Sequence, residues 1–384
     1  MSSIQDIFQT CGDEFIVKRK PPVRIRKVIG CIKNCKTIKL GGHVSKCKDC
    51  CKTIIHANSC RNRHCSKCQY LKQIQWVSEQ MKKLMDISYF HIVFTLPKEL
   101  RQFCFYNQEL IYNLLFKAAS RALSQLSASK RHFHAQIGFT AILHTWTQQL
   151  LYHPHIHCVV TGGGMSMDGN SFIESSSKFF LPVKVVSRKF RGKFLCYLKK
   201  VYNKGKLKLA GDLVCLKSPF EFFNLLYKLN KMEWVVYTKE PFSSPENVLR
   251  YLGRYTHRVA ISDAKIKAFD NGMITFEFTD RKDGCKKKLL IITADEFILR
   301  FCMHILPDKF VKIRHFGLHA NANINTKLRT CQRITDTKRR KKEFEEFIAE
   351  SENFVKRTGQ DFNICPHCGG PMEVVASFLR GQAP

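Results

Sequence analysis

Acidic residues are scarce in this chain of 384 residues: 31 Asp and Glu stand against 64 Lys and Arg, which leaves a formal net charge of +33. Apolar runs are short as well. None approaches the ~20 residues that cross a bilayer, and no apolar signal segment follows Met1. We therefore expect a cytoplasmic protein without a membrane partner. Because a field of this sign concentrates polyanions, nucleic acid is the expected partner.

The chain divides into three parts by composition. Residues 1–85 are rich in Cys, Lys and Arg, and we interpret them as a zinc-binding recognition domain for nucleic acid. Residues 86–335 alternate apolar strands with amphipathic stretches and are expected to form the core. Residues 336–384 are interpreted as a basic C-terminal helix followed by a cysteine knuckle.

Hydrophobic periodicity within the core predicts individual elements. A helix is expected over residues 107–126, and strands are expected over residues 87–95, 138–146 and 155–161. The last strand should stop at the three glycines 162–164, and residues 151–154 should connect it to the strand before it. The Lys- and Arg-rich residues 184–208 contain interleaved aromatics. They fit either a DNA-tracking surface or a solvated stretch with ordinary core aromatics.

Metal-ligand spacing among the cysteines indicates zinc. Nine of the 18 cysteines precede residue 70, which does not suit a disulfide scaffold in a chain this long. Two Cys-x-x-Cys knuckles, 14 residues apart, can supply four thiolates to one tetrahedral site: Cys47, Cys50, Cys65 and Cys68. Further candidates, for this site or a second one, are Cys60, His64, Cys31, Cys35, His43 and Cys51. A segment this charged needs the metal because it buries little apolar area.

Two arginines and a distant knuckle adjoin these cysteines. Arg61 and Arg63 stand between candidate ligands, where they would be held for contacts with phosphates or bases, unless they are simply solvated charges. Near the other end of the chain, Cys365 and Cys368 form a further knuckle that supplies only half a site. Cys331 is its one neighbour in sequence, so whether it binds zinc stays open.

Histidines and tyrosines supply the candidate catalytic groups. His155 and His157 alternate with Ile156 on a predicted strand, so both imidazoles face the same side and can grip one divalent ion. Tyr251 and Tyr255 are about one helical turn apart and can address one site. Such a pair usually packs in a core, but Arg250, Arg254 and Arg258 surround it and indicate a phosphate.

At these residues the sequence resembles the rolling-circle insertion-sequence transposases of the IS91 type, which are HUH (His-hydrophobic-His) endonucleases. The resemblance covers most of the chain. It rests on residues 40–44, 58–68, 90–97, 144–146, 153–158, 162–164 and 251–262, which occur in the family's order. Thr147 stands where a Gly is usual and Ser66 where a Pro is common, but neither departure touches a proposed ligand or nucleophile.

The resemblance implies an α+β fold: a central antiparallel sheet with helices on one side, ferredoxin- or RRM-like, preceded by the small zinc domain. It also implies a Mg²⁺ or Mn²⁺ ion on His155 and His157, with Gln148 as third ligand and Gln149 or His144 as fallbacks. Tyr251 or Tyr255 would cut single-stranded DNA and keep its 5′ end as a phosphotyrosine. Arg254 and Arg258 would contact the DNA.

Partners and rivals follow from the same resemblance. The substrates would be single-stranded DNA at the element ends and the target, at the nucleoid of a bacterial or archaeal cell. Because no Gly-x-x-x-x-Gly-Lys-Ser/Thr motif is present, a host helicase or the replication machinery would unwind the duplex.

A plasmid replication initiator or relaxase uses the same chemistry, but neither usually begins with a cysteine module. A non-catalytic zinc protein that binds nucleic acid is the rival from another class.

Overall fold

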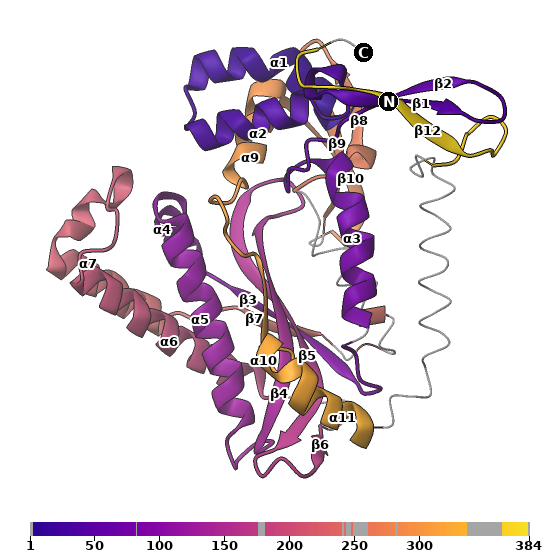
Figure 1. The fold of residues 1–384 in the computed structure, drawn as a ribbon. Helices are drawn as coiled ribbons and strands as arrows, with labels where there is room; N and C mark the ends of the chain where they lie inside the picture. Colours follow the sequence, from indigo (N-terminus) through magenta and orange to yellow (C-terminus); the bar gives the residue numbers. More distant parts are fainter. Residues whose placement is uncertain are drawn as a thin grey trace.

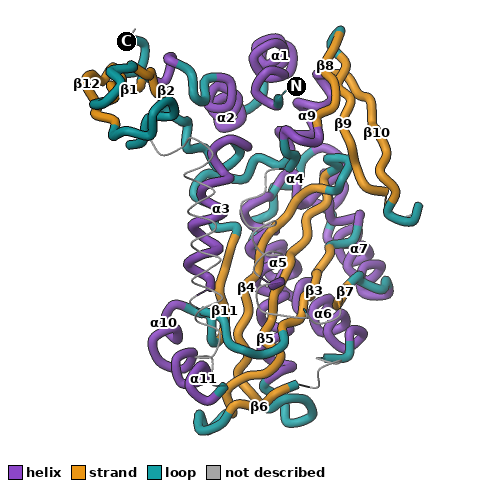
Figure 2. The backbone as a smooth tube through the Cα atoms, turned by 90° about the vertical axis from the view of Figure 1, so that its right-hand side faces the viewer, coloured by secondary structure: helices purple, strands orange, loops and turns teal. Residues whose placement is uncertain are grey.

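A computed structural model of the chain describes residues 3–81, 83–175, 181–239, 242, 247–248, 260–280, 283–335 and 363–382. These residues form three antiparallel sheets with helices around them (Figures 1 and 2). The predicted α+β class is therefore confirmed. None of the described helices is both long enough and apolar enough to cross a membrane.

The largest sheet, here called the core sheet, has the strand order β11-β4-β5-β3-β7, and β6 pairs with β5. Its strands are β3 (Tyr89–Thr95), β4 (Ala135–Trp146), β5 (Tyr152–Ser166), β6 (Phe172–Glu174), β7 (Val236–Lys239) and β11 (Ile313–Gly317). Helices α4 (Arg101–Tyr106), α5 (Gln108–Ser127), α6 (Val183–Asn203) and α7 (Pro219–Lys231) lie beside it (Figure 1). The three core strands and the long helix predicted from periodicity correspond to β3, β4, β5 and α5.

Alternation along the strands gives the core sheet two different faces. One face carries Phe94, Phe139 and Ile156, which are fully buried with apolar residues of α5 and α6 in the main hydrophobic cluster. The opposite face carries Ile142 and Val159, which are buried in another cluster with residues of α3 (Ser66–Met81) and α11 (Arg329–Ile334). Helical segments therefore lie against both faces, whereas the resemblance implied helices on one side.

Strand β5 runs past the three glycines at which it was expected to stop. A side chain on Gly162 would meet the backbone oxygen of Ser88 at 2.6 Å, and one on Gly164 would meet that of Gln136 at 2.4 Å. Here glycine permits close approach of neighbouring backbone and does not mark a turn. The connection to β4 lies between Trp146 and Tyr152, slightly before the expected residues 151–154.

A second hydrophobic cluster joins the two halves of the chain. Helices α1 (Ile4–Arg19) and α2 (Val23–Lys33) pack with α9 (Ala294–Met303) and with the sheet β10-β9-β8. The strands of that sheet are β8 (Ile266–Asp270), β9 (Met273–Asp280) and β10 (Lys286–Thr293). Residues assigned to the core by composition thus pack on the N-terminal helices, because burial of the apolar side of α1 requires a partner.

The third sheet, here called the terminal sheet, has the order β12-β1-β2. It consists of β1 (Gly42–Cys47), β2 (Thr53–Ala57) and β12 (Met372–Phe378), so the last described strand pairs with one from the N-terminal part (Figure 1). The expected division at residue 336 assigns β1 and β12 to different parts of the chain, whereas in the fold the two strands pair.

The basic residues 184–208 fall mostly on α6. Phe190 and Phe194 are fully buried in the main cluster, so these two aromatics are core residues, as the second of the two interpretations held.

Candidate functional site

Three histidines meet on the face of the core sheet opposite α5 and α6. His155 and His157 lie on β5, and His144 lies on β4 directly opposite His155 in the strand register. Their ligand nitrogens all lie within 4.8 Å of one another. We call these three residues the histidine group. The spacing of His155 and His157 thus predicted their shared face correctly, and antiparallel pairing adds the third ring.

Neighbouring hydrogen bonds orient two of these rings. His155 Nδ1 lies 2.6 Å from the carbonyl oxygen of His153, so Nδ1 carries the proton and donates it. Nε2 is therefore the nitrogen of His155 that carries the lone pair of the ring. His157 Nδ1 lies 2.8 Å from Nε2 of the buried His91 on β3, and the two rings are parallel within 6°. Partners that fix the tautomer of a ligating imidazole are typical of metal sites.

His91 is a contact that sequence analysis did not assign. It lies within residues 90–97, which resemble the family. The sequence of one strand, however, does not show which residue of the neighbouring strand a side chain will contact. The register pairs His91 with Val159, so that the neighbour two residues away on the same face is His157.

The expected third ligand, Gln148, stays a prediction, and the structure gives its side chain another partner. Gln148 follows β4 in the connection to β5, and its Oε1 accepts a hydrogen bond from Lys265 Nζ at 2.6 Å. The ring that completes the histidine group belongs to His144, one of the two fallbacks. The reason is geometric, because a residue on the strand opposite His155 projects onto the same face, whereas one in the connection need not.

The predicted nucleophiles Tyr251 and Tyr255, together with Arg254 and Arg258, lie outside the described residues. Described residues precede and follow the segment that contains them, here called the tyrosine segment, and these flanking residues have defined surroundings. Before it, Val248 is fully buried in the cluster that includes Ile142, and Ile142 pairs with His157. After it, Asp263 accepts hydrogen bonds from the Ile4 backbone at 2.9 Å and from Ser66 Oγ at 2.8 Å.

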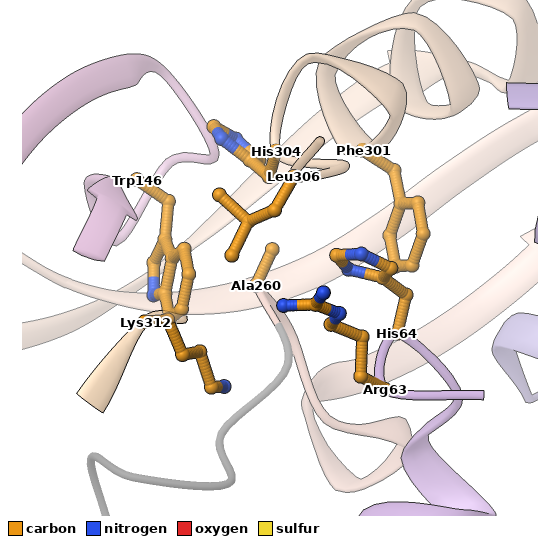
Figure 3. A pocket seen from close by; sticks show the side chains of 8 residues that line it. All are labelled: Arg63, His64, Trp146, Ala260, Phe301, His304, Leu306 and Lys312. Carbon is orange, nitrogen blue, oxygen red and sulfur yellow. The ribbon is translucent and has the colours of Figure 1, made fainter. Parts of the chain in front are cut away.

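A small cavity of about 20 Å³ lies where the N-terminal part meets the core (Figure 3). In Figure 3, Arg63 and His64 face Trp146 and Lys312 across it, and Ala260, the first described residue after the tyrosine segment, lies between them. Trp146 also stacks on His144, with ring centroids 4.6 Å apart. The cavity therefore adjoins the histidine group.

Positive charge gathers around this cavity. None of its eight described lining residues is acidic. Burial, and then the charge of Arg63, lowers the pKa of Lys312 to about 8. Burial, followed by the charges of Lys312 and Arg63, lowers the pKa of His64 to about 3, so His64 is neutral at physiological pH. An anion approaching this region meets cations that lack acidic partners in the lining.

Of the two arginines considered for DNA contacts, Arg63 has a structural partner. Its Nη1 donates to the Phe310 carbonyl at 2.5 Å, and its side chain is half-buried. Arg63 therefore ties the N-terminal part to the core. Arg61 is exposed and has a positive φ of 52°.

The cysteines form two groups, and the single four-cysteine site expected from the knuckles is corrected. The first cysteine group consists of Cys35, Cys60, Cys65 and Cys68, and the second cysteine group consists of Cys47, Cys50, Cys365 and Cys368. The two predicted knuckles cannot share an ion because the β1–β2 hairpin separates them. A strand of five residues spans about 17 Å.

The first cysteine group lies at the open end of this hairpin. Cys68 Sγ is 3.5 Å from Cys35 Sγ and 3.6 Å from Cys60 Sγ. Cys60, the further candidate from sequence, belongs to this group, whereas His64 does not. Cys35 follows α2 and is positioned by Gln5, whose Nε2 donates to its carbonyl at 2.8 Å. Side-chain hydrogen bonds from Cys60 and Cys65 lower the pKa of Cys35 to about 7.

The second cysteine group lies at the closed end of the hairpin. Cys47 and Cys365 are buried. Backbone N–H groups of Cys368 and His367 lower the pKa of Cys365 to about 6, which favours its thiolate. The C-terminal knuckle by itself supplies only half a site, as the spacing predicts. Cys47 and Cys50, and not Cys331, lie beside it and complete the group.

Comparison with known proteins agrees with these features. Residues 7–96 match a family model described as a transposase zinc-binding domain, and residues 138–327 match one described as a putative transposase. A protein from Sinorhizobium fredii, named putative transposase y4qJ, is 40% identical over 98% of this chain and 96% of its own length. The transposase for insertion sequence element IS801 from Pseudomonas savastanoi pv. phaseolicola is 28% identical over 69% of this chain and 62% of its own length. No solved structure matches significantly.

A zinc-binding domain followed by a transposase core defines the class, so the chain is a transposase and acts on DNA. It belongs to the IS91-type family, as its two domain matches and its two relatives indicate.

Proposed function

We propose that this transposase cuts and rejoins single-stranded DNA through a covalent tyrosine intermediate, with a divalent metal ion held by the histidine group. The observation that carries this proposal is the convergence of His144, His155 and His157 within 4.8 Å on adjacent strands. Three imidazoles suit a divalent transition metal, and Mn²⁺ or Mg²⁺ completed by water and phosphate oxygens is the expected ion. Such an ion, when bound, polarises the scissile phosphate.

Tyr251 and Tyr255 are the proposed nucleophiles. In the first step the phenol oxygen of one tyrosine forms a bond to phosphorus and gives up its proton. The bond from phosphorus to the 3′ oxygen breaks, and that oxygen leaves as a 3′-hydroxyl after taking up a proton. The reverse reaction, with a different 3′-hydroxyl, joins strands without external energy. Val248 lies three residues before Tyr251 and is buried in the same hydrophobic cluster as Ile142, the strand partner of His157, which supports an approach of this segment to the histidine group.

DNA would be held by cations around the site. Arg61, Arg254 and Arg258 are proposed to contact phosphates, and the positive charge of Arg63 and Lys312 near the histidine group supports the approach of a DNA strand. The substrates are proposed to be single-stranded element ends and target DNA at the nucleoid in the cytoplasm. A host helicase or the replication machinery would supply these strands during rolling-circle transposition.

The first cysteine group is proposed to bind the structural zinc of the matched zinc-binding domain. Cys65 precedes α3 and Cys68 lies in its first turn, where the helix dipole stabilises thiolates. Ser66 between them also bonds to Asp263, just after the tyrosine segment. The zinc would therefore fix the position of Asp263, which follows the tyrosine segment, as well as the fold of the recognition domain.

A nicking assay tests the metal site. Labelled single-stranded DNA from an element end should be cut only with Mg²⁺ or Mn²⁺, and His157→Ala should lower the rate by on the order of 10³-fold or more while DNA affinity stays the same. His132→Ala, a histidine in the loop before β4 and outside the group, is the matched control. Cutting by His157→Ala at the wild-type rate would remove the nuclease assignment and favour a protein that only binds DNA.

The nucleophiles are tested by trapping the covalent intermediate. The DNA–protein adduct should map by peptide mass to Tyr251 or Tyr255. Each single Tyr→Phe variant should retain nicking through the other phenol, and the double variant should bind DNA but form no adduct. An adduct that survives in the double variant would move the nucleophile to another residue.

A further inference from the structure

The two ends of the chain meet in the second cysteine group. Cys47 Sγ lies 3.4 Å from Cys368 Sγ, and Cys50 Sγ lies 3.6 Å from Cys365 Sγ, across sequence separations of 321 and 315 residues. A disulfide has an S–S distance of about 2.05 Å. Zinc–sulfur bonds of about 2.3 Å in a tetrahedron place the sulfurs about 3.8 Å apart. The observed spacing is therefore close to that of a tetrahedral tetrathiolate site.

The two knuckles that supply these thiols have the same backbone conformation. In the first, Cys47 N–H donates to the Lys52 carbonyl at 2.9 Å and Cys51 N–H donates to the Cys47 carbonyl at 3.1 Å. In the second, Cys365 N–H donates to the Gly370 carbonyl at 2.8 Å and Gly369 N–H donates to the Cys365 carbonyl at 2.9 Å. Counting the first cysteine of each knuckle as position 1, the N–H of position 1 donates to the carbonyl of position 6, and the N–H of position 5 donates to the carbonyl of position 1. Both turns therefore have the same pair of hydrogen bonds.

The fifth position of each turn confirms this equivalence. Cys51 has a φ of 56° and Gly369 a φ of 78°, so both residues are in the left-handed region. A non-glycine residue in this region is strained, by roughly 1–2 kcal/mol. The chain adopts the strained conformation at Cys51 and so gives both knuckles one shape. Two equivalent knuckles that face each other present four thiols around one centre.

Apolar burial does not account for the sheet that carries these knuckles. In β12 the side chains of Val374 and Val375 are 57% and 56% exposed, and on β2 Ile55 is 54% exposed. The described apolar residues of this sheet that are buried include Cys47 and Phe378, which lie near opposite ends of it. Something other than a hydrophobic core must hold β12 against β1, and metal ligation is the usual device in sheets of this size.

We propose that Cys47, Cys50, Cys365 and Cys368 bind a second structural zinc ion, separate from the first cysteine group, which fastens the C-terminal end of the chain to the N-terminal domain. The donor set of four thiolates selects zinc or iron among common metals. The proposal is independent of the nuclease chemistry, because neither knuckle contains a member of the histidine group.

Metal content of the full-length protein tests this proposal. The wild-type chain should hold two zinc ions by elemental analysis after dialysis, and Cys365→Ser/Cys368→Ser should hold one. Cys196→Ser/Cys215→Ser, which removes two exposed cysteines outside both groups, is the control and should hold two. One zinc in the wild type, two in the C-terminal double variant, or iron with its visible absorption in place of zinc would overturn the assignment.

Alkylation of the wild-type protein keeps the test open if the double variant fails to fold. Cys50 and Cys368 are exposed, so iodoacetamide can reach their thiols unless a metal holds them. Under reducing conditions we expect iodoacetamide to label Cys196 and Cys215 at once, and Cys50 and Cys368 only after zinc is removed with a chelator. Equal labelling of all four before chelation would contradict a metal at this site.

Discussion

The core sheet and the terminal sheet are both antiparallel, but they have opposite patterns of burial. Ten of the twelve residues of β4 are buried, whereas five consecutive residues of β12 are exposed. Hydrophobic burial at about 25 cal/mol per Å² can hold the first sheet but contributes little to the second. The terminal sheet is instead flanked by thiols at its closed end. If the second cysteine group binds zinc as proposed, one chain uses apolar packing for the sheet that carries the histidine group and metal ligation for the small terminal sheet.

Removal of zinc should produce the largest difference in stability between the two sheets. Structural zinc contributes on the order of 10 kcal/mol to the folding of small domains. After treatment with a strong chelator, backbone amides of β1 and β2 should exchange hydrogen for deuterium within seconds, while those of β4 and β5 stay protected. Hydrogen exchange with mass spectrometry measures both in one sample. If chelation speeds exchange in β4 and β5 as much as in β1 and β2, the two sheets do not differ in their dependence on zinc.

A matched pair of truncations should give the next largest difference. Phe139 is fully buried and stacks on Phe316 with ring centroids 5.0 Å apart, so Phe139→Ala should destabilise the protein by about 3–5 kcal/mol. Val375→Ala on the terminal sheet removes a side chain that is 56% exposed, and should change stability by less than about 0.5 kcal/mol. Urea unfolding followed by a core signal checks Phe139→Ala, and hydrogen exchange of β1 and β2 checks Val375→Ala. A large effect of Val375→Ala would mean that apolar contacts also hold the terminal sheet.

What sequence analysis could predict differs between the same two regions. The strands and the long helix of the core follow from local periodicity, which is why His155 and His157 were assigned to one face. The contributions of His91 and His144 depend on the register between strands, which no local pattern specifies. The grouping of cysteines depends on pairing between β1 and β12, which are remote in sequence, so spacing identified candidate ligands but joined the wrong knuckles.

Acid should destabilise the core sheet by an intermediate amount, at the place where His304 meets the end of β4 and its connection to β5. His304 is buried, with Nδ1 3.2 Å from Thr145 Oγ1 and Nε2 3.0 Å from the Leu150 carbonyl, and burial lowers its pKa to about 4. Because the unfolded pKa is about 6.5, the unfolded state binds the extra proton, and stability falls as the pH drops from about 6.5 toward 4. Between pH 7 and pH 5 this single residue should cost about 2 kcal/mol.

The variant His304→Gln isolates this contribution. Gln can make both hydrogen bonds but does not titrate, and the cysteine groups are the same in both proteins, so their acid sensitivity cancels. Urea midpoints at pH 7 and pH 5 should therefore move less in the variant than in the wild type. Equal shifts in the two proteins would show that His304 does not contribute to the acid sensitivity.

The smallest expected effect tests the equivalence of the two knuckles in the terminal sheet. Gly369→Ala places a side chain in the left-handed region and should weaken the C-terminal knuckle by about 1 kcal/mol. Cys51→Gly removes the same strain from the other knuckle, but it also gives the unfolded chain more freedom, so its net effect should lie within about 0.5 kcal/mol of zero. Competition for zinc against a chromophoric chelator measures both variants, since a weakened knuckle releases its ion at a lower chelator concentration. The order expected is Gly369→Ala first, with wild type and Cys51→Gly close together. If Cys51→Gly instead released zinc as readily as Gly369→Ala, Cys51 would contribute more than a backbone position, and the two turns would not be equivalent.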